Sequence, residues 1–405
     1  MVERECYMER VRPFMETDLI KVFTGIRRCG KSVMLELVQK ELKKRGAREE
    51  QFIKINFENL ANSHICEAKA LHKYIQHRIR GINGKSYLFL DEIQEVKAWE
   101  KCVNSIRAAS GCDIYITGSN ANLLSGEFAT YLAGRYVEFT IYPFSFSEFL
   151  ELYRTKFPNA SKQDAFRIFI EVGGMPFLSN LRFGYAASMQ YLQDIYNSVM
   201  LKDIIKRNNI RQIDLHERIV AFVMANFGKS FSATSISKYF KSEHRTVATE
   251  TVLNHLKYCE NAHLFCRLNR QDIDSKKIFR INEKYYAADH GLKEAVAGKD
   301  SRNIATILEN IVCIELLKRG YSLFVGKKDS MEVDFIAEKN GSRIYVQVAY
   351  LLASAETIER EFLPLKKIKD NYPKFVLSMD TLDFSRDGII HRNVAEATLA
   401  AALFA

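Results

Sequence analysis

The sequence predicts an α/β protein that begins with a parallel β-sheet covered by helices and continues into helical and then mixed segments. Three observations support this class. A glycine-rich octapeptide lies between a short apolar strand and a helix, strands and helices alternate up to about residue 150, and the pattern changes after residue 215. The expected domains are a sheet core over 1–150, a helical lid over 151–215, a winged helix-turn-helix over 216–298 and a second α/β domain over 299–405.

The octapeptide Gly25-Ile26-Arg27-Arg28-Cys29-Gly30-Lys31-Ser32 fits the P-loop, or Walker A, pattern G-x-x-x-x-G-K-[ST] at every required position. An apolar strand over 19–24 precedes it and a helix over 32–45 follows, so the loop is expected at a helix N-terminus, where partial positive charge favours phosphate. Lys31 is expected to reach the β- and γ-phosphates, and Ser32 to ligate Mg²⁺. The stretch from Gly25 to Val33 therefore predicts a site for ATP and Mg²⁺.

Eight cysteines occur singly, with no C-x-x-C pair, which indicates free thiols in a reducing cytosol rather than disulfides or a zinc site. Cys29 carries a separate hypothesis. The amides of the loop, the helix dipole and the neighbouring Arg27 and Arg28 would favour its thiolate. The alternative is that Cys29 is a small residue tolerated at a variable position.

Composition and charge narrow the class of protein further. The 405 residues contain no uncharged apolar run near the roughly 20 residues that span a bilayer, and the N-terminus lacks an apolar signal core, so a cytoplasmic protein without a membrane segment is expected. The net charge is +10, and residues 201–300 contain 18 Lys or Arg against 12 Asp or Glu. This excess suggests an anionic partner, with nucleic acid first, although solvated faces also explain such counts.

Two acidic residues end the third predicted element of the sheet. After a strand over 51–57 and a helix over 69–80, the strand over 87–92 finishes in Asp91 and Glu92. In a P-loop protein this is the Walker B arrangement, in which Asp91 holds the Mg²⁺ shell and Glu92 orients or deprotonates the attacking water. The alternative is a strand end that meets solvent.

Polar residues also follow the next strand, over 113–117, which runs into Gly118-Ser119-Asn120. Ser119 or Asn120 is expected to sense the γ-phosphate by hydrogen bonding, and the alternative is a plain turn. Arg135 precedes a strand over 136–142. It is a candidate arginine finger, supplied within the chain or by a neighbour, and the alternative is an ordinary ion-paired arginine.

The segment after residue 215 has helix-turn-helix spacing, with helices over 219–227 and 232–240, a recognition helix over 246–256, and wing strands over 262–268 and 277–281. Residues expected to meet phosphates or base edges are His244, Arg245, Thr246, Thr249 and Asn254, with Arg270 and Lys276 on the wing. Glu243 and Glu250 oppose phosphate, and winged helices also dock proteins, so duplex DNA and a protein partner both remain open. In the preceding lid, Lys202, Lys206 and Arg207 are candidates to approach the nucleotide.

The last hundred residues begin with a helix over 304–319, followed by strands over 331–337 and 343–350; a further strand within 370–378 and a helix over 395–405 close the chain. This order resembles the PD-(D/E)-x-K nuclease core, which implies Glu309 and Asp334 as metal ligands. Gln347 stands where that pattern has an acid, and Ala349 where it has the lysine. Lys374 or Lys327 is the expected substitute, and a degenerate site of Glu309, Asp334 and Gln347 is the prediction.

Several segments together resemble one family: GIRRCGKS, YLFLDE, ITGSN, LAGRY followed by PFSFSEFL, VGGMP and YYAADHGLK. They are similar to bacterial and archaeal AAA-type ATPases with a C-terminal domain of unknown function, over nearly the whole chain. The resemblance implies a restriction-endonuclease-like terminal domain and allows a homo-oligomer. Three functions follow: an ATPase that switches a nucleic-acid-contacting module, an ATPase that regulates a protein partner or assembly, and an ATP-dependent nuclease, which is disfavoured.

Overall fold

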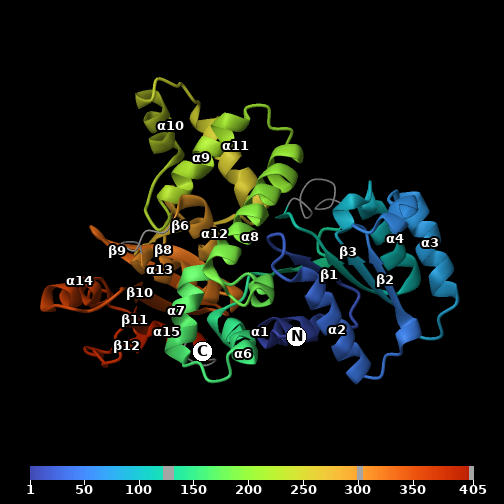
Figure 1. Ribbon diagram of the computed structural model, residues 1–405, viewed down its shortest axis with the longest axis horizontal. Helices are drawn as coiled ribbons and strands as arrows, with labels where there is room; N and C mark the ends of the chain where they lie inside the picture. The colour runs from blue at the N-terminus through green and yellow to red at the C-terminus, as the bar shows by residue number, and fades with distance from the viewer. Residues whose placement is uncertain (122–131, 299–303, 401–405) are drawn as a thin grey trace. The chain divides into compact units, whose positions relative to one another are not determined.

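The structure is a computed structural model that describes residues 1–121, 132–298 and 304–400, and the chain divides into two compact units. The first comprises Met1–Ile141 with Asn261–His263, and the second comprises Tyr142–Glu260 with Leu264–Ala405. The unit that contains the P-loop therefore ends before the predicted boundary at residue 150. Figure 1 shows the elements of both units along the chain.

The first unit contains a five-stranded parallel sheet in the order β2-β3-β4-β1-β5. Its strands are β1 (Ile20–Thr24), β2 (Phe52–Asn56), β3 (Tyr87–Asp91), β4 (Asp113–Thr117) and β5 (Tyr136–Thr140). Its helices are α1 (Glu5–Val11), α2 (Lys31–Lys44), α3 (Ala68–Arg80) and α4 (Trp99–Ser110), with the short 3-10 helices η1 (Arg12–Phe14), η2 (Glu49–Gln51), η3 (Leu60–Ile65) and η4 (Ile93–Glu95). The predicted parallel sheet is confirmed, and β3, β4 and β1 bring their carboxyl ends to one edge.

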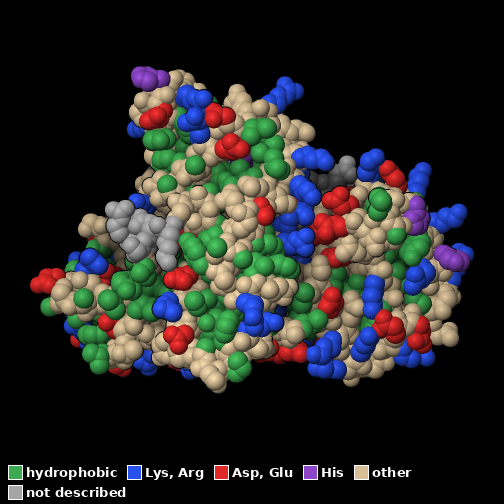
Figure 2. Space-filling model, viewed as in Figure 1, with side chains coloured by type: hydrophobic (Ala, Val, Ile, Leu, Met, Phe, Trp, Pro, Cys, Tyr) green, Lys and Arg blue, Asp and Glu red, His purple; other side chains and the backbone are tan. Residues whose placement is uncertain are grey.

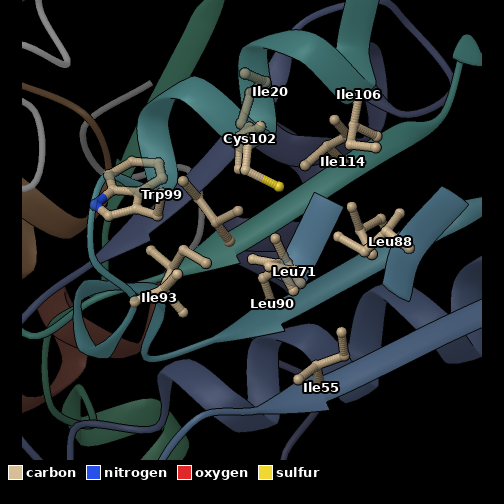
Figure 3. Packing of buried hydrophobic residues seen from close by; sticks show 14 of the residues in the cluster. Ile20, Ile55, Leu71, Leu88, Leu90, Ile93, Trp99, Cys102, Ile106 and Ile114 are labelled. Carbon is tan, nitrogen blue, oxygen red and sulfur yellow. The ribbon is translucent and has the colours of Figure 1, made fainter. Parts of the chain in front are cut away.

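The core of this unit explains why its strands are almost continuously apolar. Leu88 and Leu90 of β3 pack with Leu71 of α3 on one face of the sheet, as Figure 3 shows. Phe89, between them in sequence, faces the other way and stacks on Tyr115 of β4, with ring centroids 5.0 Å apart and planes 8° from parallel. Because side chains alternate along a strand and both faces are covered, every position of β3 is buried.

The second unit contains a mixed seven-stranded sheet in the order β12-β11-β10-β9-β8-β6-β7. Its strands are β6 (Phe265–Asp272), β7 (Ile278–Ala287), β8 (Ser322–Lys328), β9 (Met331–Lys339), β10 (Ser342–Val348), β11 (Lys374–Ser378) and β12 (Ile389–Asn393). Its helices are α6 (Phe146–Lys156), α7 (Lys162–Val172), η6 (Pro176–Leu181), α8 (Tyr185–Ser198), the π-helix η7 (Val199–Lys206), α9 (Ile213–Ala225), α10 (Ala233–Ser242), α11 (Thr249–Asn261), α12 (His290–Ala297), α13 (Ile304–Lys318), α14 (Ala355–Lys366) and α15 (Val394–Leu399). The predicted lid is helical throughout most of its length.

The predicted winged helix differs from the structure in three respects. The two wing strands form the antiparallel hairpin β6–β7, but β6 also pairs in parallel with β8, so the hairpin is the edge of the terminal sheet rather than a separate wing. The connection between α10 and α11 runs over 243–248, which is longer than the three or four residues of a helix-turn-helix turn. The recognition helix starts at Thr249, so Thr246 precedes it.

The C-terminal end of the described chain also differs from the expected closing helix over 395–405. A strand, β12, pairs in parallel with β11, and α15 ends at Leu399. The rest of the predicted helix, 401–405, lies outside the described residues. Within the described ranges, no helix is long and apolar enough to cross a membrane.

Candidate functional site

The backbone of the P-loop requires its two glycines. Gly25 has φ +144°, and a Cβ at this residue would lie 2.2 Å from the carbonyl oxygen of Ile141. Gly30 has φ +102° and directly precedes α2. Both angles fall where side chains are rarely tolerated, so only glycine lets the chain pass from β1 into the loop and from the loop into the helix. The loop therefore stands at the N-terminus of α2, as predicted, with Val33 in the first turn.

Lys31 is held at the centre of this loop. Its side chain is buried, and its ammonium group donates hydrogen bonds of 3.3 Å to the carbonyl oxygens of Gly25 and Ile26. It also lies 3.5 Å from a carboxylate oxygen of Glu92. The lysine of the P-loop and the second acid of β3, which are far apart in the sequence, are thus neighbours.

Asp91 contacts side chains from three other elements, α2, β4 and β2. Its carboxylate accepts hydrogen bonds from the hydroxyl of Ser32, from the Thr117 hydroxyl at 2.6 Å and from the Asn56 amide at 3.0 Å. Burial raises the pKa of Asp91, and the bonds from Thr117 and Ser32 oppose that rise. Ser32 and Asp91 thus lie together, as a shared Mg²⁺ requires, because Mg²⁺ in such sites takes a few protein oxygens and completes its shell with phosphates and water.

The described parts of the chain contain no group of three or more His, Cys, Asp or Glu side chains that could hold a metal ion. A P-loop site does not need one. A serine hydroxyl and a single carboxylate are the protein ligands that the P-loop arrangement supplies to Mg²⁺. Ser32 and Asp91 fit this role by chemistry and by position.

Glu92 has an unusual backbone and an ionised side chain. Its φ of +55° is in the left-handed region, and its amide donates to the Thr117 hydroxyl at 2.9 Å. Burial pushes the pKa of Glu92 upward, but the Lys31 ammonium and the Gln94 amide outweigh burial, so the pKa lies below its ordinary value. A carboxylate held in this form is able to accept a proton from water.

Thr117 contacts both acids of the candidate site, and the sequence analysis did not identify it. It is the last residue of β4, it is buried, and it binds both Asp91 and the amide of Glu92. The expected sensors, Ser119 and Asn120, follow immediately and are also buried. Their role as sensors stays a prediction. The signal that could have identified Thr117 is the hydroxyl at the end of a strand adjacent to β3, but the sequence does not show which strands are adjacent.

Arg135 lies at the amino end of β1, whereas the P-loop follows the carboxyl end of the same strand. Its carbonyl accepts a hydrogen bond from the amide of Ile20 at 2.9 Å, at the amino end of β1, and the exposed guanidinium donates to Asn104 at 3.2 Å. The length of β1, about 3.3 Å per residue, separates it from the loop. This position argues against a finger supplied within the same chain, and leaves a finger from a neighbouring copy as a prediction.

The structure contradicts the reactive-thiol hypothesis for Cys29. The side chain is fully buried, and burial raises the pKa of its thiol, while Lys31 and Arg4 lower it by a smaller amount. Arg4 donates to the Cys29 carbonyl at 3.0 Å, and Arg27 turns outward to Glu58 at 3.1 Å. Arg28 is exposed with φ +69°. Cys29 therefore packs beneath the loop as a small apolar residue.

The terminal sheet brings together the three residues of the predicted degenerate site. The amide of Asp334 donates to the Gln347 side chain at 3.2 Å, and Asp334 accepts from the amide of Val348 at 2.9 Å. Glu309 of α13 accepts from the hydroxyl of Tyr286 at 3.1 Å. Their role as a degenerate nuclease site stays a prediction, and the lysine near them is neither of the two expected.

Lys284 of β7 supplies the cation of this acidic cluster. Its ammonium lies 2.8 Å from Glu332, 3.5 Å from Asp334 and 3.6 Å from Glu309. Burial by itself would lower the pKa of Lys284, but the three carboxylates outweigh burial and raise it. Burial, with Asp334 nearby, raises the pKa of Glu309 to about 8.

The expected substitutes for this lysine are placed elsewhere. Lys374 donates to the Asp370 carbonyl at 2.6 Å, and the ammonium of Lys327 lies 5.4 Å from the ring centre of Phe279. Lys284 comes instead from the β6–β7 hairpin, which the sequence pattern predicts as the wing of a separate domain.

The predicted DNA-contacting residues are partly committed to other partners. Arg245 forms an ion pair with Asp214, and Arg270 lies 3.6 Å from Glu332. The Thr249 hydroxyl accepts from Ser237 at 3.3 Å. His244 and Asn254 are exposed, as are Thr246 and Lys276. The face that would meet a groove therefore carries fewer free cations than the sequence suggests.

Comparisons with known proteins agree with the nucleotide site. Residues 17–150 match a family described as AAA domain, and residues 163–303 match a domain of unknown function, DUF8612. An uncharacterised protein of Haemophilus influenzae is 38% identical over 378 residues, which cover 93% of each chain. The uncharacterised protein MJ1544 of Methanocaldococcus jannaschii is 31% identical, over 87% of this chain and 79% of its own.

Among solved structures, the Walker-type ATPase of Pyrococcus abyssi aligns with a TM-score of 0.51. The alignment covers 73% of this chain and 94% of that protein, at 16% sequence identity. At this identity the likeness concerns the fold.

Proposed function

Because the chain belongs to the family of AAA-domain P-loop ATPases that includes these two relatives, we propose that it hydrolyses ATP with Mg²⁺ and uses the nucleotide state to switch its second unit. The observation that supports hydrolysis best is the position of Glu92. Its ionised carboxylate lies 3.5 Å from the ammonium group of Lys31, and Glu92 directly follows Asp91 in the chain. Binding alone does not need this second acid, whereas deprotonation of an attacking water does.

The proposed roles follow from the geometry. The loop amides and Lys31 would hold the β- and γ-phosphates, and Ser32 with Asp91 would ligate Mg²⁺. The metal ion, when bound, neutralises charge on the phosphate oxygens. Thr117 fixes the Asp91 carboxylate and the backbone of Glu92, so that Glu92 is held where it would orient the water and take its proton. Asn120 and a neighbour's Arg135 would complete the site.

The output that we propose for the second unit is contact with double-stranded DNA. The excess of positive charge between residues 201 and 300 supports an anionic partner, and duplex DNA, with its dense phosphate charge, is a partner of this kind. The alternative is an ATPase that regulates a protein partner or assembly, with the winged-helix-like α9–α11 segment as a docking module. A homo-oligomer is compatible with either.

An ATP-dependent nuclease is the third alternative, and the acidic cluster argues against it. Gln347 and Ala349 stand where a PD-(D/E)-x-K nuclease has its second acid and its lysine. Lys284 moreover pairs with all three surrounding carboxylates, which a catalytic metal would otherwise use. The residues therefore favour a restriction-endonuclease-like domain that has no nuclease activity.

Steady-state hydrolysis and binding of a fluorescent ATP analogue by three variants test the ATPase. Lys31→Ala should lose both nucleotide binding and hydrolysis, because the phosphates lose their main cation. Glu92→Gln should still bind but hydrolyse about 10²- to 10⁴-fold more slowly, the usual contribution of a general base. Lys44→Ala, an exposed lysine at the end of the same helix, is the control and should match the wild type. Undiminished hydrolysis by Lys31→Ala would overturn the proposal.

A further inference from the structure

The helix α8 continues directly into η7, a π-helix of eight residues. π-helical geometry is rare and frequently occurs at functional sites. One side of η7 is buried, through Val199, Met200, Asp203, Ile204 and Ile205. The other side is exposed and carries Lys202 and Lys206. Because a π-turn joins residue i to i+5, Lys202, Lys206 and the following Arg207 share that outer side.

This segment carries more positive than negative charge. Asp203 is the one acidic residue between Val199 and Arg211, and its side chain is 1% exposed. The side chains of Lys202, Lys206, Arg207 and Arg211 take part in no ion pair with any residue in the described ranges. We call Lys202, Lys206 and Arg207 the η7 basic face. Figure 2 draws Lys and Arg side chains in blue, and several lie near the position of α8 in Figure 1.

Neighbouring cations of the same unit behave differently. Arg218 and Arg245 both pair with Asp214, and Glu243 and Glu250 flank the start of the predicted recognition helix. A row of like charges without counterions raises the local positive potential, and a polyanion relieves it by releasing its condensed counterions. The η7 basic face therefore has the charge pattern that a phosphate backbone requires, and α11 has it to a smaller degree.

We propose that the η7 basic face, rather than the predicted recognition helix, binds the phosphate backbone of double-stranded DNA. This inference rests on the proposed DNA contact and names its surface. Lysine and arginine contacts to phosphate position a protein on the duplex and carry no base preference of their own. The binding is therefore strongly salt-dependent and nearly independent of sequence.

The test is fluorescence anisotropy of a labelled mixed-sequence duplex with the full-length protein, between about 50 and 200 mM salt. In K202Q/K206Q/R207Q, the slope of log affinity against log salt should fall by about 3, and affinity at low salt by at least about tenfold. The matched control K229Q/K238Q/K241Q removes three exposed lysines around α10 and should keep the wild-type slope. The single variant K206Q should lower the slope by about 1 and serves if the triple variant does not fold.

Three results would overturn the inference, and they can be told apart. If the wild type does not bind duplex at low salt, the proposed DNA contact fails, and the surface with it. If the control variant loses binding while K202Q/K206Q/R207Q retains it, DNA contact stands but its surface lies around α10. If K202Q/K206Q/R207Q raises the KM for ATP and leaves duplex affinity unchanged, these residues belong to the nucleotide site, as a lid would place them.

Discussion

Thr117 joins the two acids of the proposed ATP site through a single hydroxyl, which donates to Asp91 and accepts from the amide of Glu92. Both of these residues are buried. Thr117→Val keeps the shape of the side chain and removes both bonds. We expect the free energy of unfolding to fall by about 1–3 kcal/mol, because the buried amide of Glu92 loses its acceptor, whereas Asp91 keeps its bonds from Ser32 and Asn56. ATP hydrolysis should fall as well, while ATP binding is retained.

Urea unfolding and steady-state kinetics measure the two effects of Thr117→Val. Ser119→Ala changes the next buried hydroxyl in the chain and is the comparison. If Thr117→Val hydrolyses ATP at the wild-type rate while Ser119→Ala does not, the residue after the strand is the sensor and the role assigned to Thr117 is wrong.

How much of the site the sequence predicts depends on how local its signals are. Gly25, Lys31 and Asp91 are recognised because the patterns of a loop, a helix start and a strand end each involve residues that are adjacent in the sequence. Thr117 and Lys284 are not, because their importance comes from contacts between segments that are distant in the sequence, which a single sequence does not reveal. The cause is the same for both residues: hydrophobic periodicity identifies strands but not their neighbours.

At the scale of elements, two of the sequence motifs turn out to contact each other. Asp289, just before α12, accepts hydrogen bonds from the amides of Gly174 at 2.6 Å and Gly291 at 2.9 Å. Gly173, which ends α7, has φ +81°, and a Cβ there would lie 2.2 Å from an Asp289 carboxylate oxygen. The segments VGGMP and DHGLK thus form one joint between α7 and α12, and this joint requires glycine for space as well as for conformation.

Gly173→Ala should destabilise the protein more than its backbone angle alone explains. The matched control is Gly298→Ala, because Gly298 has nearly the same φ, +80°, and nothing within 4 Å of its added Cβ. The control should lose about 1–3 kcal/mol, the cost of this conformation in a residue other than glycine. The variant at Gly173 should lose that amount and a further penalty from the clash. Equal denaturation midpoints for the two variants would show that Asp289 moves away from the added Cβ without loss of stability.

At the scale of the whole molecule, the terminal sheet crosses the boundary that the sequence places at residue 298. β6 and β7 precede this boundary, while β8 and β9 follow it. Lys284 lies on one side of the boundary, and the three carboxylates that neutralise it lie on the other. A chain that ends at residue 298 would expose the edge of β6 and leave a buried ammonium without its partners.

Residues 1–298, produced alone, should therefore aggregate or elute as a polydisperse species in size-exclusion chromatography, whereas the full chain should not. Co-expression of residues 299–405 should restore a defined species, because the missing strands and carboxylates return together. The P-loop unit lies entirely before the cut, so nucleotide binding by any soluble fraction reports separately on that unit. A monodisperse 1–298 fragment with cooperative unfolding would instead show that the boundary at 298 separates two independent domains, and that the β6–β8 pairing contributes little to stability.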